Sequence, residues 1–362
     1  MKYIEEFRQG AVAAEFARRM RAYAGRPVNL MEVCGTHTVS IFRHGIRSLL
    51  PPNVNMLSGP GCPVCVTANA DLDKAIALAK EPGVILATFG DMLKVPGSYS
   101  SLREAKAEGA DVRIVYSPLD ALELARENPT KSVVFYAIGF ETTAPAIACS
   151  VLEAERLGLD NYFIISVHKL VPPALRALLD SDDVRIDGFL LPGHVSTVIG
   201  SRPYEFTARD YGVPGVIAGF EPLDILQGIA MLLEQIADGK ASIEIQYRRA
   251  VRPEGNTKAL EYLYRLFEPC DAEWRGLGFI PQSGLRLREE YASFDAERRF
   301  EIKGPPPREH PGCRCGDVLR GVVAPPECPL FARACTPEHA VGPCMVSSEG
   351  TCAAWYRYGG AA

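Results

Sequence analysis

The sequence predicts an α/β protein in which two similar parallel-sheet domains face each other across a cleft and a loop-rich domain follows at the C-terminus. Three observations predict this fold. Short apolar segments ending in Gly or Pro alternate with helical segments through the first two thirds of the chain. The polar loops after these segments are alike in the two halves. From residue 304 onward the composition changes to Pro, Gly and Cys, which is typical of a region that no apolar core holds together.

The strand and helix predictions follow from composition and length. Eight short segments rich in β-branched and aromatic residues have the pattern of buried strands: 27–35, 53–61, 83–90, 111–118, 132–140, 161–168, 186–194 and 215–220. Helical segments are expected at 70–80, 101–109, 118–128 and 221–239. This alternation indicates a parallel sheet flanked by helices, with functional groups at the strand ends. A strand that leads into a turn at 241–256 and a helix at 257–269 are expected beyond it.

The domain boundaries rest on the similarity of the two halves. "EVCGTHT" (32–38) and "IGFETTAP" (138–145) both put polar residues after a strand, and "LSGPGCPVC" (57–65) and "LLPGHVSTV" (190–198) both put a Pro-Gly turn there. We therefore predict an N-terminal helix over 1–24, a first α/β domain over 25–128, a second over 129–239 and a C-terminal domain over 240–362. A cleft between two such units is the expected place for a site.

Charge and segment composition exclude several classes of function. The chain has 362 residues, a net charge of −5 and a pI near 5.8, so nothing favours binding to nucleic acid or to an anionic membrane. It has neither a secretion signal at its start nor an apolar stretch of about 18 residues, and we expect a cytoplasmic protein. In a reducing compartment, eleven cysteines indicate metal or redox chemistry rather than disulfides.

The end of the chain holds the densest group of thiols. Cys328, Cys335, Cys344 and Cys352 are separated by six, eight and seven residues. Four thiolates on loops hold either zinc or an iron–sulfur cluster, and this loose spacing favours a [4Fe–4S] cluster because zinc sites usually contain tighter pairs. Cys313 and Cys315 lie close enough in the chain to compete as ligands.

A second pair of thiols has the pattern of a redox site. Cys62 and Cys65 form a C-x-x-C sequence just before a helix that we expect to begin between residues 67 and 71. The N-terminus of a helix stabilises a thiolate, so reversible dithiol/disulfide chemistry is favoured. The alternative is half of a zinc site completed by another pair of cysteines.

Further candidates lie at predicted strand ends. Cys34, followed by His37, is a nucleophile with its base, a soft metal ligand, or a packed residue. Glu141 and His194 are candidates for acid–base catalysis or metal binding, although a single residue of either kind more often has a structural role. The same ambiguity applies to His168 and Lys169.

Taken together, the motifs resemble a known family. "CGTHT", "GPGCPVC", "GFETTAP", "PGHVS" and "GPCMVSSEGTCAAWY" occur in this order and resemble the HypD family of [NiFe]-hydrogenase maturation proteins from about residue 30 to the C-terminus. The resemblance implies two similar α/β domains and a C-terminal iron–sulfur domain. It also implies HypC-type and HypE-type partners, the latter supplying cyanide, with which the Fe(CN)₂CO group of the hydrogenase large subunit is assembled.

The resemblance also implies roles for individual residues. Cys34 becomes the ligand of a transiently bound iron, faced by His194, and Cys62 and Cys65 become a redox-active pair. His37 and Glu141 are then expected to position or protonate ligands in the cleft. The implied ligands of the [4Fe–4S] cluster are Cys328, Cys335, Cys344 and Cys352.

Two other functions compete with this one. An iron–sulfur thiol–disulfide reductase acting on protein disulfides accounts for the C-terminal cysteines and for the C-x-x-C pair, but it leaves "CGTHT" and "PGHVS" unexplained. A non-catalytic interaction protein with structural zinc predicts a colourless protein without labile sulfide. We prefer the first function, an assembly scaffold with redox activity. Whether it counts as an enzyme stays open, because the iron centre is a product that is carried away.

Overall fold

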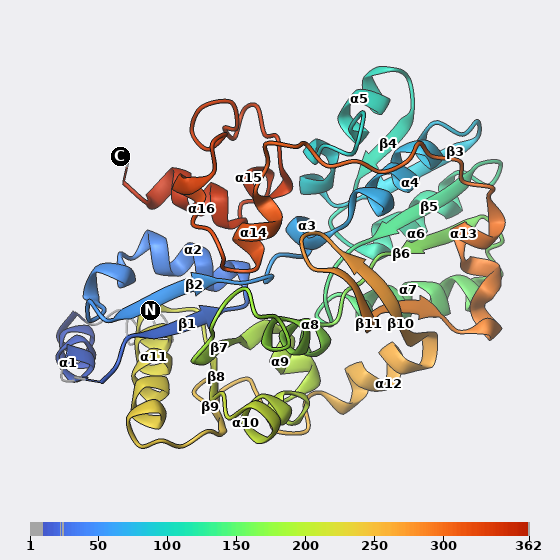
Figure 1. The fold of residues 1–362 in the computed structure, drawn as a ribbon. Helices are drawn as coiled ribbons and strands as arrows, with labels where there is room; N and C mark the ends of the chain where they lie inside the picture. The colour runs from blue at the N-terminus through green and yellow to red at the C-terminus, as the bar shows by residue number, and fades with distance from the viewer. Residues whose placement is uncertain (1–9, 22, 24, 361–362) are drawn as a thin grey trace.

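The computed structural model describes residues 10–21, 23 and 25–360, and its described part contains two parallel sheets with helices packed on their faces (Figure 1). The strand order of the first sheet is β2-β1-β7-β8-β9. Its strands are β1 (Val28–Glu32), β2 (Val54–Ser58), β7 (Gly188–Pro192), β8 (Gly215–Ala218) and β9 (Ile243–Ile245). The order of the second sheet is β4-β3-β5-β6. Its strands are β3 (Val84–Thr88), β4 (Asp111–Ile114), β5 (Ser132–Ala137) and β6 (Tyr162–Ser166).

Helices precede, connect and follow these strands. The longer α-helices are α1 (Gly10–Arg21), α2 (Gly35–Arg43), α4 (Asn69–Ala79), α5 (Leu102–Ala107), α6 (Pro118–Glu127), α7 (Ala144–Leu157), α8 (Val171–Leu179), α9 (Gly193–Ile199), α10 (Glu205–Tyr211), α11 (Pro222–Ala237), α12 (Thr257–Leu266) and α16 (Thr351–Tyr358). The short ones are α3 (Pro63–Val66), α13 (Ala296–Arg299), α14 (Cys315–Leu319) and α15 (Pro343–Val346). The 3₁₀ helices are η2 (Ile46–Leu49), η3 (Gly90–Lys94), η4 (Arg202–Tyr204), η5 (Glu289–Phe294) and η6 (Pro325–Glu327). The α/β class and the predicted strands are confirmed. Helix α1 lies within the segment expected as an N-terminal helix, 1–24, of which residues 1–9, 22 and 24 lie outside the described part of the chain.

Alternation of side chains along each strand buries both faces of each sheet. In β1, the neighbouring residues Leu30 and Met31 are both fully buried and belong to different cores. Leu30 packs into the core that contains α11, whereas Met31 packs into the core that contains α8 and α9. In the second sheet, α6 and α7 cover one face and α4 and α5 the other. Strands buried on both sides are expected in a parallel sheet, which explains their nearly continuous apolar sequences.

The chain visits the two sheets in a different order from the one expected. Segments 25–128 and 129–239 each contribute two strands to each sheet, so the sheets do not coincide with these predicted domains. The chain passes from the first sheet to the second after β2 and returns after β6. Similar loop motifs indicated that two units exist, but a loop motif carries no information about which strands form hydrogen bonds with one another.

The segment expected as one C-terminal domain, 240–362, is also divided. Strand β9 completes the first sheet. Helix α12 and the antiparallel hairpin of β10 (Phe267–Trp274) and β11 (Gly278–Leu287) pack into the core of the second sheet. Only the cysteine-rich segment that begins near residue 304 has the loop-rich character expected of the whole domain. It lies beside α2 and α3 (Figure 1).

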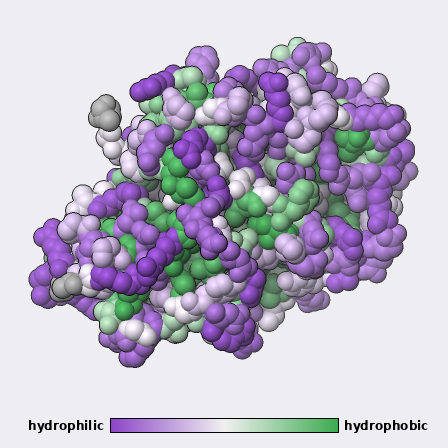
Figure 2. Space-filling model, viewed as in Figure 1, coloured by the Kyte–Doolittle hydropathy of each residue, from purple (hydrophilic) through white to green (hydrophobic). Residues whose placement is uncertain are grey.

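On the face of the molecule shown in Figure 2, apolar residues lie at the centre and polar residues around them. Figure 2 shows hydrophobic residues gathered in the middle of one face, with hydrophilic residues over most of its rim. None of the helices in the described ranges combines the length and the apolar composition that a membrane span requires.

Candidate functional site

Three of the sequence motifs meet at one edge of the first sheet. Strands β1, β2 and β7 are parallel neighbours, so the loops that follow them emerge at the same carboxyl edge. These loops carry Cys34, Cys62 and His194 respectively. The Gly35 N–H donates a hydrogen bond to the Gly61 carbonyl at 3.0 Å. A Cβ on Gly61 would lie 2.2 Å from the Cys34 nitrogen, so only glycine permits this approach of the two loops.

Cys34 is held as a neutral thiol at the start of α2. Its side chain is 7% exposed, and its backbone N–H donates to Glu32 Oε2 at 3.1 Å. Burial raises the pKa of Cys34 to about 12, and the carboxylates of Glu349 and Glu32 raise it further against the opposing N–H group of His37. A thiol in this setting releases its proton when a positive charge, such as a metal ion, binds beside it.

His37 and His194 both pack against one aromatic ring. The ring centroid of Phe220 is 4.9 Å from that of His37 and 3.8 Å from that of His194. His37 Nε2 donates to the carbonyls of Ala218 at 3.2 Å and Gly219 at 2.9 Å, so Nδ1 carries the lone pair. Nδ1 is buried and has no hydrogen-bond partner. Burial lowers the pKa of His37 to about 4 and also lowers that of His194, so both are neutral at pH 7.

The site contains a carboxylate that sequence reasoning missed. Thr36 Oγ1 donates to Glu349 Oε1 at 2.7 Å, and a Cβ on Gly35 would lie 2.5 Å from Glu349 Cβ. The Glu349 charge raises the pKa of both Cys34 and His194, although burial has the larger effect on each. Glu349 is part of the motif "GPCMVSSEGTCAAWY", but nothing in a single sequence connects it to a loop more than 300 residues earlier.

Glu141 lies in the loop that follows β5 of the second sheet. Its Oε1 accepts a hydrogen bond from the Val171 N–H at 2.9 Å, and its Oε2 is buried without a partner. Burial raises the pKa of Glu141 to about 7. The Ser196 hydroxyl of the "PGHVS" loop donates to the Tyr204 hydroxyl at 3.3 Å. Burial raises the pKa of Tyr204, and Coulomb interactions with Glu141 and Cys34 raise it further. Tyr204 is therefore the residue that lies near both Glu141 and Cys34.

The C-x-x-C pair forms a disulfide in a short helix. Cys62 caps α3, Cys65 lies within it, and the two sulfurs are bonded. The expected helix does begin in the predicted interval, at Asn69 of α4, but Cys65 already belongs to the separate helix α3. Helix α3 packs against α14 and α15. As a result, Cys62 and Cys65 share one apolar core with Cys315 and Cys344.

Six cysteines of the C-terminal segment surround one pocket. The lining includes the four predicted ligands and the two competitors: Cys313, Cys315, Cys328, Cys335, Cys344 and Cys352. The sulfurs of Cys315 and Cys344 are 2.7 Å apart. Hydrogen bonds with Cys313 and Cys344 hold the pKa of Cys315 well below its usual range, whereas those with Cys315 and Cys352 raise the pKa of Cys344. Thiols that share protons in this way form a soft donor set that suits an iron–sulfur cluster.

This donor set suits a cluster but does not identify which cysteines are its ligands. More thiols are present than the four that a [4Fe–4S] cluster needs. Within the described ranges, no group of three or more His, Cys, Asp or Glu side chains is arranged to hold a single metal ion. Cys335 also accepts a hydrogen bond from the Val341 N–H at 3.4 Å, of the kind that stabilises a thiolate.

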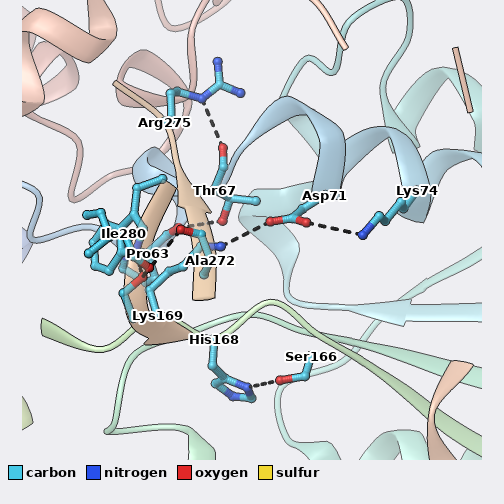
Figure 3. A network of polar contacts seen from close by, with 12 residues as sticks. Pro63, Thr67, Asp71, Lys74, Ser166, His168, Lys169, Ala272, Arg275 and Ile280 are labelled. Carbon is cyan, nitrogen blue, oxygen red and sulfur yellow. Dashed lines mark hydrogen bonds and ion pairs between the residues drawn. The ribbon is translucent and has the colours of Figure 1, made fainter. Parts of the chain in front are cut away.

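The remaining candidates, His168 and Lys169, belong to a structural network. His168 Nδ1 contacts Ser166 Oγ at 3.0 Å, and burial lowers the pKa of His168 to about 3. Lys169 Nζ pairs with Asp71 Oδ2 at 3.2 Å, and Asp71 is also near Lys74 (Figure 3). These contacts join α4, the loop after β6 and the β10–β11 hairpin. They give His168 and Lys169 no place at the edge that carries Cys34.

Comparison with known proteins gives one consistent result. The HypD model, described as the hydrogenase formation hypA family, matches residues 11–359. The chain is 52% identical to the hydrogenase maturation factor HypD of Azotobacter vinelandii, over 99% of this chain and 97% of that protein. It is 47% identical to hydrogenase maturation factor HypD of Escherichia coli, over 99% and 98% of the two chains. It is also 52% identical to the hydrogenase expression/formation protein HupD of Azotobacter chroococcum.

Proposed function

This chain belongs to the HypD family of hydrogenase maturation proteins, and we propose that it is the iron–sulfur redox scaffold on which, with HypC-type and HypE-type partners, the Fe(CN)₂CO group is assembled. The observation that carries this proposal is the meeting of three thiol groups in one region. Cys34 lies against the loop of Cys62 through the Gly35–Gly61 contact, and Cys62 and Cys65 share a core with the C-terminal cysteines.

Cys34 is the proposed anchor of the iron, which is cargo rather than a resident cofactor. Cyanide and carbon monoxide bind to electron-rich iron, and thiolate is a soft, electron-donating ligand. Binding of a metal cation offsets the burial that keeps the Cys34 thiol protonated. His194 is neutral and lies near the Glu349 carboxylate, which also influences Cys34, so its imidazole is the proposed second contact of the iron.

The other polar groups have supporting roles. The lone pair on His37 Nδ1 is available to accept a hydrogen bond from a bound group, because Nε2–H is held by two carbonyls. The Glu349 carboxylate fixes Thr36 and, as a negative charge, favours retention of the cation at Cys34. Glu141 is expected to act indirectly, through Tyr204 and the "PGHVS" loop.

The C-terminal cysteines are the proposed holders of a [4Fe–4S] cluster, with Cys328, Cys335, Cys344 and Cys352 as ligands and Cys313 and Cys315 as the competing pair. When bound, such a cluster stores single electrons. The Cys62–Cys65 disulfide is a two-electron store: two electrons and one proton convert it to a thiol and a thiolate, and a second proton converts the thiolate to a thiol. Its location against α14 and α15 suits exchange of electrons with the cysteine group.

A maturation assay tests the function. Cys34→Ala is expected to abolish hydrogenase maturation in cells that lack their own copy of the protein, while the iron–sulfur absorbance of the purified variant stays intact. Cys149→Ala, which changes a partly buried cysteine on α7, is the matched control and is expected to mature hydrogenase normally. Normal maturation by Cys34→Ala would contradict the proposed anchor. Loss of the absorbance would show that Cys34 supports the cluster instead.

The second candidate function is an iron–sulfur thiol–disulfide reductase. The packing of the Cys62–Cys65 helix against the cysteine group favours it as much as it favours the scaffold. The reductase requires Cys62 and Cys65 but has no use for the Cys34–Glu349–His194 arrangement. Two results together would favour the reductase: the Cys34→Ala variant still reduces protein disulfides, and the wild-type protein carries no iron with cyanide or carbonyl ligands.

A further inference from the structure

The turn of the β10–β11 hairpin lies between the two thiol groups. Trp274 ends β10 and forms a bridge with Thr67, and the Arg275 N–H donates to the Val66 carbonyl at 2.9 Å. On the other side, a Cβ on Gly276 would lie 2.3 Å from the Cα of Gly316, the residue after Cys315. The turn therefore contacts the end of the C-x-x-C helix and the start of α14 at the same time.

The side chain of Arg275 reaches the chain just after the disulfide. It is 6% exposed; its Nε donates to the Thr67 carbonyl at 3.1 Å and its Nη2 donates to Asn69 Oδ1. Figure 3 shows the contact with Thr67, whose hydroxyl in turn donates to the Pro63 carbonyl at 2.8 Å. One guanidinium thus fixes both the end of α3 and the beginning of α4, which limits the movement available to Cys65.

The positive charge of Arg275 is weakly compensated. The groups that accept hydrogen bonds from Arg275, the carbonyls of Val66 and Thr67 and the amide oxygen of Asn69, are all neutral. Among the described contacts, its carboxylate partner is Glu309, which is half exposed and whose Oε1 lies 3.8 Å from Nη1. By contrast, the neighbouring buried cation Lys169 is paired with Asp71. A buried cation without a close anion is costly, so it favours negative charge on groups nearby.

Reduction of the disulfide creates such a negative charge. The Cys62–Cys65 bond takes up two electrons and one proton and leaves one thiol and one thiolate. In the apolar core that the pair shares with Trp274, a cation acts over a longer distance than in water. We propose that Arg275 is a positioning residue for the redox pair, which holds the chain that follows Cys65 and raises the reduction potential of Cys62/Cys65. This proposal rests on the redox role in the proposed function.

The test is the equilibrium of the pair with reduced and oxidised glutathione at pH 7. The full-length protein is equilibrated anaerobically, its thiols are trapped with N-ethylmaleimide, and the peptide that carries both cysteines is quantified by mass spectrometry. Arg275→Gln is expected to shift the equilibrium about tenfold toward the disulfide, which corresponds to about 30 mV for two electrons. Arg275→Lys keeps the charge and is expected to stay within about threefold of wild type.

Two surface variants complete the test. Glu309→Gln removes the carboxylate that partly neutralises Arg275, and it is expected to shift the equilibrium about twofold toward the dithiol. If Arg275→Gln does not fold, this variant tests the effect of the Arg275 charge instead. Arg320→Gln removes a cation that Asp183 and Asp317 already neutralise, and it is expected to leave the equilibrium unchanged.

The outcomes separate this inference from the proposed function. A folded Arg275→Gln variant with the wild-type equilibrium would overturn the inference and leave the proposed function standing, as would an unchanged equilibrium in Glu309→Gln. An Arg275→Lys variant that folds but shifts as far as Arg275→Gln would also overturn it, since the charge would then have no effect. A wild-type pair that does not exchange with glutathione would contradict both the inference and the redox role.

Discussion

At the scale of single residues, burial decides the chemistry of the site. Cys34, His37 and Glu141 all depart from their usual pKa values, and in each case burial is the largest cause. The effect favours the neutral form of all three groups. The two of these groups that lie at the carboxyl edge of the first sheet, Cys34 and His37, are therefore uncharged at neutral pH.

The raised pKa of Glu141 makes the stability of the fold depend on pH. Its pKa is raised to about 7 in the folded protein, so the folded state retains a proton that the unfolded state loses near pH 4.5. The stability that this proton contributes is complete below pH 4.5 and is lost as the pH rises to about 7. The raised pKa of an acid therefore makes unfolding easier at higher pH.

Glu141→Gln should remove this pH dependence. The difference in the free energy of unfolding between wild type and variant is expected to change by about 1–3 kcal/mol from pH 5 to pH 8, with the variant gaining relative stability as the pH rises. Denaturant unfolding at both pH values measures it, with Glu155→Gln on the exposed face of α7 as the control. A constant difference across this range would show that Glu141 is ionised in the folded protein.

The residues that sequence reasoning found and missed differ in one physical respect. Cys34, Cys62 and His194 follow strands in local motifs, so a single sequence reveals them. Glu349 and Phe220 act through contacts between distant segments: Glu349, in the C-terminal segment, accepts a hydrogen bond from Thr36, and Phe220 packs against two histidines. No local pattern records such contacts.

At the scale of elements, close backbone contacts hold the thiol loops together. The loops after β1 and β2 touch at Gly61, and the hairpin turn touches α14 at Gly276 and Gly316. These positions have no space for a side chain. The glycines of "CGTHT" and "GPGCPVC" therefore serve the approach of one loop to the next rather than the flexibility of either loop.

Gly61→Ala tests this packing. The added methyl group would overlap the backbone of Val33 and Cys34, and we expect the free energy of unfolding to fall by about 3 kcal/mol. Gly90→Ala is the control, because its methyl group would meet only Ile114 at an ordinary distance of 3.6 Å. Thermal unfolding of both variants measures the effect, and equal stability of the two would show that the loops separate without cost.

The cysteine group gives a second prediction at this scale. Cys344→Ala is expected to abolish the iron–sulfur absorbance and to loosen the C-terminal segment, because Cys344 is buried in the lining of the pocket and a bound cluster adds folding energy. Absorbance spectra and limited proteolysis measure the two effects. If the colour survives, Cys313 or Cys315 belongs to the ligand set.

At the scale of the whole molecule, the order of strands explains how distant motifs meet. The α/β class and most elements were predictable because period and composition are local properties. The sharing of strands between the two sheets was not, because β1 pairs with β7 across more than 150 residues and the strand sequences are alike. This pairing brings the "PGHVS" loop beside "CGTHT", which consecutive domains would have placed on opposite sides of a cleft.

The central claim is that Cys34 anchors an iron with cyanide and carbonyl ligands. The most direct measurement is an anaerobic infrared spectrum of the protein with its HypC-type partner, in the stretching region of these ligands, with Cys34→Ala beside it. We predict bands in the wild type and none in the variant, while both keep the iron–sulfur absorbance. Bands of equal strength in the variant, or none in a wild type with its partners present, would contradict the claim.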